Sequence, residues 1–127
     1  MKRLSKQQVL LLHDQLLDSS GGTDGLRDMG LLDSAMAAPD AGFDDQEFYP
    51  TVVAKAARLA FGLVNNHPFV DGNKRIGVLA MLVTLQGNGI PVTSAEDDLI
   101  DLGLSLAEGR MTTHDVVAWI ESHTDRE

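Results

Sequence analysis

The sequence predicts an all-α protein, with about six helices around a central helix and either a loop or a short hairpin over residues 40–48. Three observations support this fold class. Apolar residues recur at spacings of three and four, glycine or proline follows most of these stretches, and hydroxyl-containing residues stand where helices should begin. At 127 residues with 43% hydrophobic residues, the chain is expected to form a single domain over 1–127 with one core.

The first two helices are marked by their ends. Ser5 and Gln8 form a capping box at the start of the first helix, and Gly21-Gly22 ends it. A second, short helix fits residues 31–38, where Pro39 stops it.

The acidic segment 40–48 follows. It carries a glycine and four acidic residues, which predicts an exposed loop or a small hairpin. Pro50 suits the first turn of the third helix, whose apolar stripe runs from Val53 to Val64. The next three residues, Asn65, Asn66 and His67, lead out of this helix into a polar loop.

The second half of the chain predicts three further helices. The central helix spans about residues 73–86 and ends at Gly87-Asn88-Gly89, and residues 90–92 are a short extended link. Cap and stop residues delimit the last two helices: Ser94 with Asp97 and Gly109 for the fifth, and Thr112 with Asp115 for the sixth.

Composition narrows the class of protein. The formal net charge is −9, which argues against a general nucleic-acid binder but not against a nucleotide ligand. Cysteine is absent, so disulfides and thiolate chemistry are excluded. No apolar run is long enough to span a membrane, and polar residues 6–8 interrupt any signal-peptide core. We therefore expect a cytoplasmic protein.

The run His67-Pro68-Phe69-Val70-Asp71-Gly72-Asn73-Lys74-Arg75 concentrates the polar chemistry, and a strongly apolar segment follows it. A helix that begins here presents free backbone N–H groups beside a glycine and two cations, which is typical of a phosphate site. Two cations in a first turn oppose the helix dipole by about a few tenths of a kcal/mol. A bound anion would offset that cost.

Each polar residue of the run has a candidate role. His67 can accept a proton near neutral pH, whereas His13, His114 and His123 lack such neighbours and are predicted to be surface or capping residues. Phe69 is predicted to anchor the loop in the core.

Asp71 has two interpretations, a cap of the central helix or a ligand of Mg²⁺. Gly72 lets the backbone approach a ligand, and Asn73 either caps the helix or donates its amide to a phosphate oxygen. Lys74 and Arg75 diverge by about 100° on a helix, so we expect Arg75 to bind a phosphate while Lys74 reaches around the rim.

The run HPFVDGNKR resembles the motif of the Fic/Doc superfamily and is most similar to its Doc (death-on-curing) toxin branch. Fic proteins have a second glycine where this chain has Lys74, and usually another arginine where it has Val78. Residues similar to those of Doc proteins also occur at 12–14, 21–22, 27–32, 49–50 and 88–89. The resemblance therefore covers nearly the whole chain. It implies a compact Fic/Doc-type helical bundle.

The resemblance also implies site roles. His67 would be the general base and Asp71 the ligand of Mg²⁺, with ATP as co-substrate. Three residues would hold the phosphate groups around the helix N-terminus: Gly72, Asn73 and Arg75. Lys74 would contact the phosphates as well and reverse the nucleotide, so that its γ-phosphate faces His67. The segment 40–49 corresponds to a flap that aligns a target peptide.

The implied function is that of a toxin in a toxin–antitoxin pair. It would be a kinase that phosphorylates a serine or threonine of a translation factor, with elongation factor Tu expected, and so inhibits translation. Some Fic proteins carry their own inhibitory helix, but the run 105–109 is one residue too short for that pattern. A separate antitoxin protein is therefore implied.

Three alternatives remain open on the sequence. The first is Fic-type transfer of AMP to a protein hydroxyl, which position 74 distinguishes from kinase activity. The second is a non-catalytic binding module of the same fold, against which the complete motif argues. The third is metal-dependent hydrolysis by His67 and Asp71, which is weakly supported because no second carboxylate or histidine lies nearby.

Overall fold

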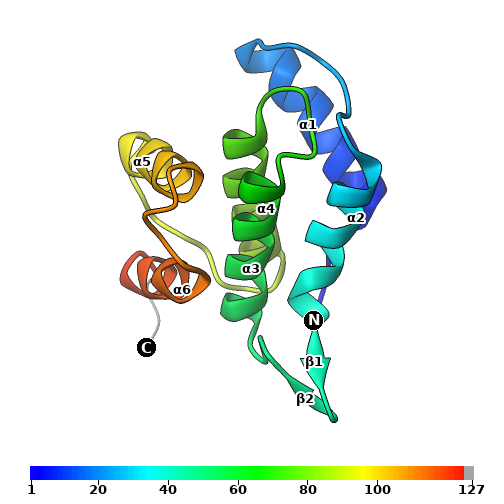
Figure 1. Cartoon of the computed structure of the whole chain (residues 1–127). Helices are drawn as coiled ribbons and strands as arrows, with labels where there is room; N and C mark the ends of the chain where they lie inside the picture. The colour runs from blue at the N-terminus through cyan, green and yellow to red at the C-terminus, as the bar shows by residue number, and fades with distance from the viewer. Residues whose placement is uncertain (125–127) are drawn as a thin grey trace.

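Two helices, α3 (Val52–Asn66) and α4 (Asn73–Gly87), form the centre of the computed structural model, which describes residues 1–124 (Figure 1). On one side lie α1 (Lys6–Ser20) and α2 (Met29–Ala37), and on the other lie α5 (Glu96–Ala107) and α6 (Thr113–Ser122). A 3₁₀ turn (Ala38–Asp40) leads from α2 into a hairpin of β1 (Gly42–Phe43) and β2 (Gln46–Glu47). The predicted all-α class is confirmed.

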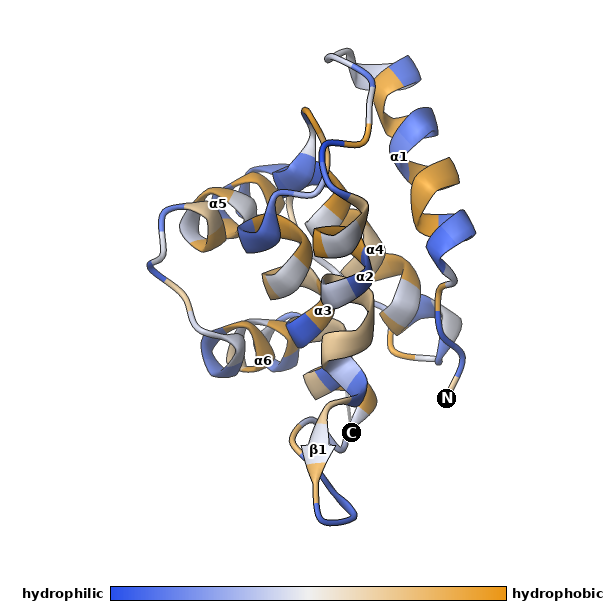
Figure 2. Cartoon of the chain, turned by 45° about the vertical axis from the view of Figure 1, so that its right-hand side comes forward, coloured by the Kyte–Doolittle hydropathy of each residue, from blue (hydrophilic) through white to orange (hydrophobic). Residues whose placement is uncertain are grey.

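The core has two parts, and the central helices contribute to both. Residues of α3 and α4 such as Ala56 and Met81 pack with α5 and α6. Others, such as Leu63 and Ile76, pack with α1 and α2. Figure 2 shows apolar and polar residues alternating along α1, α5 and α6, as expected of helices with one buried face. In residues 1–124, no helix is long and apolar enough to cross a membrane.

Two of the three helix caps predicted from pairs of residues three apart are confirmed. The boxes of Ser5 with Gln8 and of Thr112 with Asp115 are both present. The Ser94 cap is wrong, because α5 starts after Ala95 with no side-chain cap and the Ser94 hydroxyl donates to the Ala95 carbonyl instead. Three acidic residues in the first turn of α5, 96–98, face the positive end of its dipole.

Two other helix starts differ from the prediction. Helix α2 begins at Met29, two residues early, because the Asp28 carboxylate caps it by accepting the Leu31 N–H at 3.0 Å. Pro50 lies outside α3, whose N-cap is Thr51. In both cases the residue whose side chain caps the helix sets its first turn.

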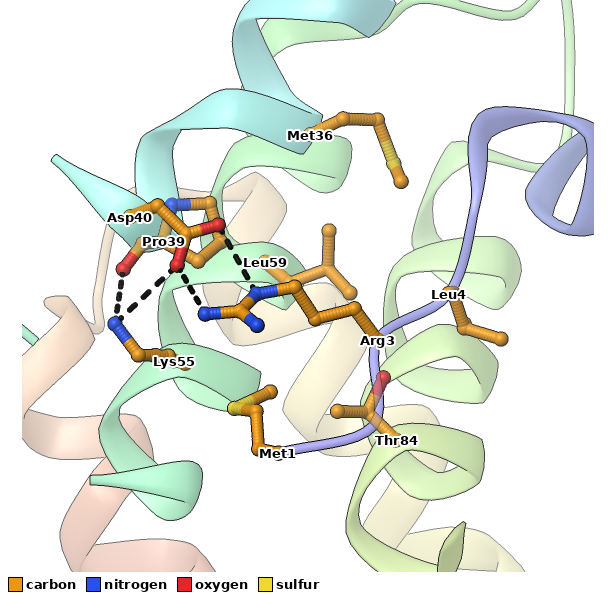
Figure 3. A pocket seen from close by; sticks show the side chains of 9 residues that line it. All are labelled: Met1, Arg3, Leu4, Met36, Pro39, Asp40, Lys55, Leu59 and Thr84. Atoms are coloured by element: carbon orange, nitrogen blue, oxygen red, sulfur yellow. Dashed lines mark hydrogen bonds and ion pairs between the residues drawn. The ribbon is translucent and has the colours of Figure 1, made fainter. Parts of the chain in front are cut away.

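Segment 40–48 forms the hairpin rather than an open loop, and Lys55 of α3 holds its base. Lys55 is only 5% exposed. Its ammonium group donates to the Glu47 carboxylate at 2.7 Å and the Pro39 carbonyl at 3.1 Å. Figure 3 shows it beside Asp40, 3.4 Å away, which also pairs with Arg3 of the N-terminal segment. The hairpin is thus tied to the central helix by a buried cation.

Replacing Lys55 with methionine should loosen the hairpin and lower the free energy of unfolding by about 1–3 kcal/mol, because charged hydrogen bonds are lost at a buried position. Hydrogen exchange of the Phe48 N–H, which is bonded to the Ala41 carbonyl, should accelerate. The matched control is Lys6→Met, which breaks an exposed pair with Asp33 and should cost under about 0.5 kcal/mol. Equal losses in the two variants would contradict the buried role.

Candidate active site

The loop between α3 and α4 is shaped by two left-handed residues. Helix α3 ends at His67, whose φ is 53°, and α4 begins after Gly72, whose φ is 80°. Between them the loop pairs with segment 21–28, which lies between α1 and α2. The Arg27 and Asp28 N–H groups donate to the Pro68 carbonyl. These bonds fix the polar run against a second loop far away in sequence.

Asn73 closes the loop from inside. It is 5% exposed, and its side-chain oxygen accepts the Phe69 N–H at 3.0 Å. Its amide nitrogen donates to the Phe69 carbonyl at 3.0 Å and to His67 Nδ1 at 2.8 Å. Both amide protons are therefore used within the loop. The Asn73 side chain thus has neither of its two predicted roles, a cap of α4 or a donor to phosphate, and only its backbone N–H is left for a ligand.

His13 supports the loop from α1, and its predicted surface position is wrong. It is 1% exposed, and its ring stacks on Phe69 at 3.8 Å between centroids. Its Nε2 donates to the Asp71 carbonyl at 2.7 Å. Phe69, also 1% exposed, is confirmed as a core anchor. The other two histidines match the prediction, since His114 is exposed and His123 is the C-cap of α6.

All six predicted site residues line one cleft of about 390 Å³. They come from the end of α3, the loop and the first turn of α4: His67, Asp71, Gly72, Asn73, Lys74 and Arg75. Val64 and Ala107 complete the wall, so the end of α5 faces the start of α4 across the cleft. A continuous nine-residue run thus becomes a single concave surface.

The start of α4 presents an anion site to this cleft. The Gly72 N–H donates to the Asp71 carboxylate, and the Ile76 N–H donates to the Gly72 carbonyl. Between them, the backbone N–H groups of residues 73–75 have no hydrogen-bond partner in the described part of the chain. Three free donors at the positive end of a helix dipole favour a phosphate group.

Asp71 remains ionised beside these donors. Its carboxylate accepts the Thr23 N–H at 3.1 Å and the Gly72 N–H at 2.8 Å, and these two bonds hold its pKa below the usual range. The N-cap of α4 is Gly72 rather than Asp71. Each carboxylate oxygen accepts one such bond and keeps a lone pair for another partner. A half-exposed oxygen ligand of this kind fits Mg²⁺ that keeps most of its waters.

The two cations differ in how they are held. Arg75 donates to the Ser20 hydroxyl at 2.6 Å and the Gly21 carbonyl at 2.9 Å, so it anchors the end of α1 to the site. Its Nη2 lies 3.8 Å from Asp71. Lys74 is exposed and has no polar partner in residues 1–124. Of the two, Lys74 is the cation that can turn to a ligand without breaking a contact.

His67 faces the cleft with Nε2, because Nδ1 accepts the Asn73 amide. The two bonds from Asn73 to Phe69 fix which end of the amide is the donor. The neutral ring therefore carries its proton on Nε2. To accept a proton from a substrate hydroxyl at Nε2, the ring must first move its own proton from Nε2 to Nδ1. That change requires the hydrogen bond from Asn73 to Nδ1 to open.

Comparisons of the sequence with known proteins find matches that include the polar run. A family model described as "Fic/DOC family" matches residues 3–85, which include the whole polar run. The chain is 42% identical over 77 residues to "Toxin Doc" of Mycolicibacterium smegmatis, a match that covers 61% of this chain and 59% of that protein. It is 27% identical over 116 residues to "Protein kinase doc" of Escherichia phage P1, covering 91% and 90% of the two chains.

Proposed function

Because this chain belongs to the Fic/DOC family, we propose that it is the toxin of a toxin–antitoxin pair and acts as a protein kinase. In this proposal it transfers the γ-phosphate of ATP to a serine or threonine hydroxyl of a translation protein, with elongation factor Tu as the expected target. The similarity to a toxin and to a protein kinase supports the class of activity. Modification of that target would inhibit translation in the cytoplasm.

The single observation that carries the proposal is the convergence of His67, Asp71 and Lys74 on one cleft at the start of α4. The free N–H groups of residues 73–75 would hold phosphate oxygens, and Arg75 would add charge as the phosphoryl group moves. The ammonium group of Lys74 would draw the phosphate chain toward itself and place its γ end near His67. Catalysis would then depend on position and charge.

The proposed reaction takes place between ATP and the target hydroxyl, with a proton acceptor in the cleft. The target hydroxyl oxygen forms a bond to the γ-phosphorus, the bond between that phosphorus and the β–γ bridging oxygen breaks, and ADP leaves. The hydroxyl proton goes to His67 after its contact with Asn73 opens. Asp71 would hold Mg²⁺, which supplies charge neutralisation for the phosphates when bound.

Asp71→Asn should lower transfer activity about 100-fold at saturating Mg²⁺, because the amide keeps the size of the carboxylate but loses its charge. Excess EDTA should abolish the activity of the unmutated chain. Asp18→Asn, an exposed change on α1, should leave activity intact. Full activity of Asp71→Asn, or of the unmutated chain in EDTA, would contradict a role for Asp71 in holding the metal.

A separate antitoxin is required if no segment of this chain inhibits its own transfer activity. Ala107 at the end of α5 lines the cleft, but Glu108 pairs with Arg110 at 2.9 Å rather than with a site arginine. Expression of the chain alone in a bacterium should arrest growth, and co-expression of its antitoxin should restore it. Harmless expression of folded, active chain would contradict the need for a separate inhibitor.

The second candidate function is AMP transfer, which the same cleft would perform if the nucleotide lay the other way round. Val78, the position where Fic proteins usually have a second arginine, is 7% exposed and packs in the core. No second arginine enters the cleft from this position, which favours the kinase. Labelling a bacterial lysate with γ- or α-labelled ATP tests the choice. We expect a protein band labelled only from the γ position, and an α-labelled band would favour AMP transfer.

A further inference from the structure

We propose that this protein has a second metal site, for a transition-metal dication such as Zn²⁺, formed by His13, Asp14 and Asp24. One ligand atom from each of these three residues lies within 4.8 Å of the other two. The first two are on α1 and the third is in the segment between α1 and α2. This site is separate from the active site, and its test does not involve ATP.

The buried imidazole is the feature that distinguishes this group from exposed acidic residues. His13 is 1% exposed, and its Nε2 donates to the Asp71 carbonyl. That bond fixes the tautomer, so Nδ1 has a lone pair, and Nδ1 has no hydrogen-bond partner in the described residues. Histidines that bind metals usually donate their other ring N–H to a carbonyl or carboxylate in this way. Nδ1 is therefore the ring atom that is available to a metal ion.

The two carboxylates suit the same ion. Asp14 and Asp24 are exposed, and neither has an ion-pair partner in residues 1–124. Tetrahedral zinc ligands lie about 3.4 Å apart, so the two exposed side chains need to close by no more than about 1.4 Å. A water would complete four-fold coordination. One imidazole nitrogen with two carboxylates favours zinc and similar ions over Mg²⁺ and Ca²⁺, which prefer oxygen ligands only.

Metal binding here would stiffen the support of the active site. The segment that carries Asp24 also holds the loop between α3 and α4. The Thr23 N–H donates to the Asp71 carboxylate, and the Val70 N–H donates to the Gly25 carbonyl. A bound ion would join this segment to α1, which already contacts Asp71 through His13. We therefore expect the ion to slow hydrogen exchange at the Thr23 and Val70 N–H groups.

Calorimetric titration of the full chain with Zn²⁺ tests the proposal. We expect one site whose affinity falls at least about 10-fold in Asp14→Asn/Asp24→Asn, because losing ligands should matter at least as much as losing a residue that orients one. Asp18→Asn/Asp45→Asn makes the same change of charge at exposed positions outside the group and should bind like the unmutated chain. The Asp variants avoid changing the buried imidazole, so folding should be preserved.

Two results would overturn the site. One is no zinc binding by the unmutated chain, and the other is equal affinity in all three proteins, which would place the ion at another histidine. Exchange measured by NMR adds a readout that other sites would not move. Zinc should protect the Thr23 and Val70 N–H groups in the unmutated chain but not in Asp14→Asn/Asp24→Asn. If zinc leaves hydrogen exchange at these two N–H groups unchanged in the unmutated chain, the proposed link to the loop between α3 and α4 is wrong.

Discussion

His67→Ala should lower phosphoryl transfer by about 10²- to 10⁴-fold, the range over which a positioned acid–base group acts. The chain should remain folded, since His67 is exposed and makes one side-chain hydrogen bond, to Asn73. Losing that bond should change the free energy of unfolding by about 1 kcal/mol. Nucleotide affinity should stay within a few-fold, because the expected phosphate donors belong to the backbone of α4. Rates and nucleotide binding of the purified variant measure both effects.

His114→Ala is the matched control for this variant. His114 is exposed on α6, outside the cleft, and its loss should leave the rate unchanged. Growth of cells that express each variant gives a second measurement, in which only His67→Ala should relieve arrest. An alanine variant at position 67 that stays as active and as toxic as the unmutated chain would eliminate His67 as the base.

Lys74→Gly should produce the second large effect, a loss of phosphoryl transfer by about 100-fold. A charged hydrogen bond to phosphate is worth about 2–3 kcal/mol, which corresponds to this change in rate. Lys74 lies at the edge of the cleft with no other polar partner in residues 1–124, so the charge is free to act on a ligand. The buried Val78 stands where Fic proteins usually have a second arginine, and the absence of that arginine argues against a gain of AMP transfer in this variant.

Lys74→Ala separates charge from backbone effects at this position. Glycine in the first turn of α4 costs about 1 kcal/mol of helix stability relative to alanine, and both variants remove the charge. If the charge orients the nucleotide, both should lose phosphoryl transfer to a similar extent. Retained transfer in Lys74→Ala would show that the lysine does not set the orientation of the phosphates.

Local sequence signals predicted much of this fold. The capping boxes at Ser5 and Thr112 involve residues three apart, so the physics that starts these helices is visible in a short window. The same reasoning failed at Ser94, because a hydroxyl can bond a neighbouring carbonyl instead of the helix N–H groups. A capping pattern shows that a side chain is able to accept a helix N–H group. Whether it does so depends on the conformation of the local backbone.

The sequence predicts which residues line the site, but not the contacts that hold these residues in place. Its six residues are contiguous in sequence, so the loop brings them to one cleft. The support of His13 depends on a bond to a residue 58 positions away, and Arg75 is held by the end of α1. No periodicity signals either contact. Asn73 illustrates the remaining ambiguity, because an amide that is able to bind phosphate is used instead to close the loop.

Intact mass spectrometry of purified elongation factor Tu, after incubation with this chain, ATP and Mg²⁺, tests the central claim most directly. The kinase account predicts a gain of about 80 Da, one phosphoryl group, that is absent with His67→Ala. A gain of about 329 Da would mean AMP transfer and contradict the orientation assigned to Lys74. An unchanged mass, with purified chain that still labels another protein in a lysate, would contradict the target.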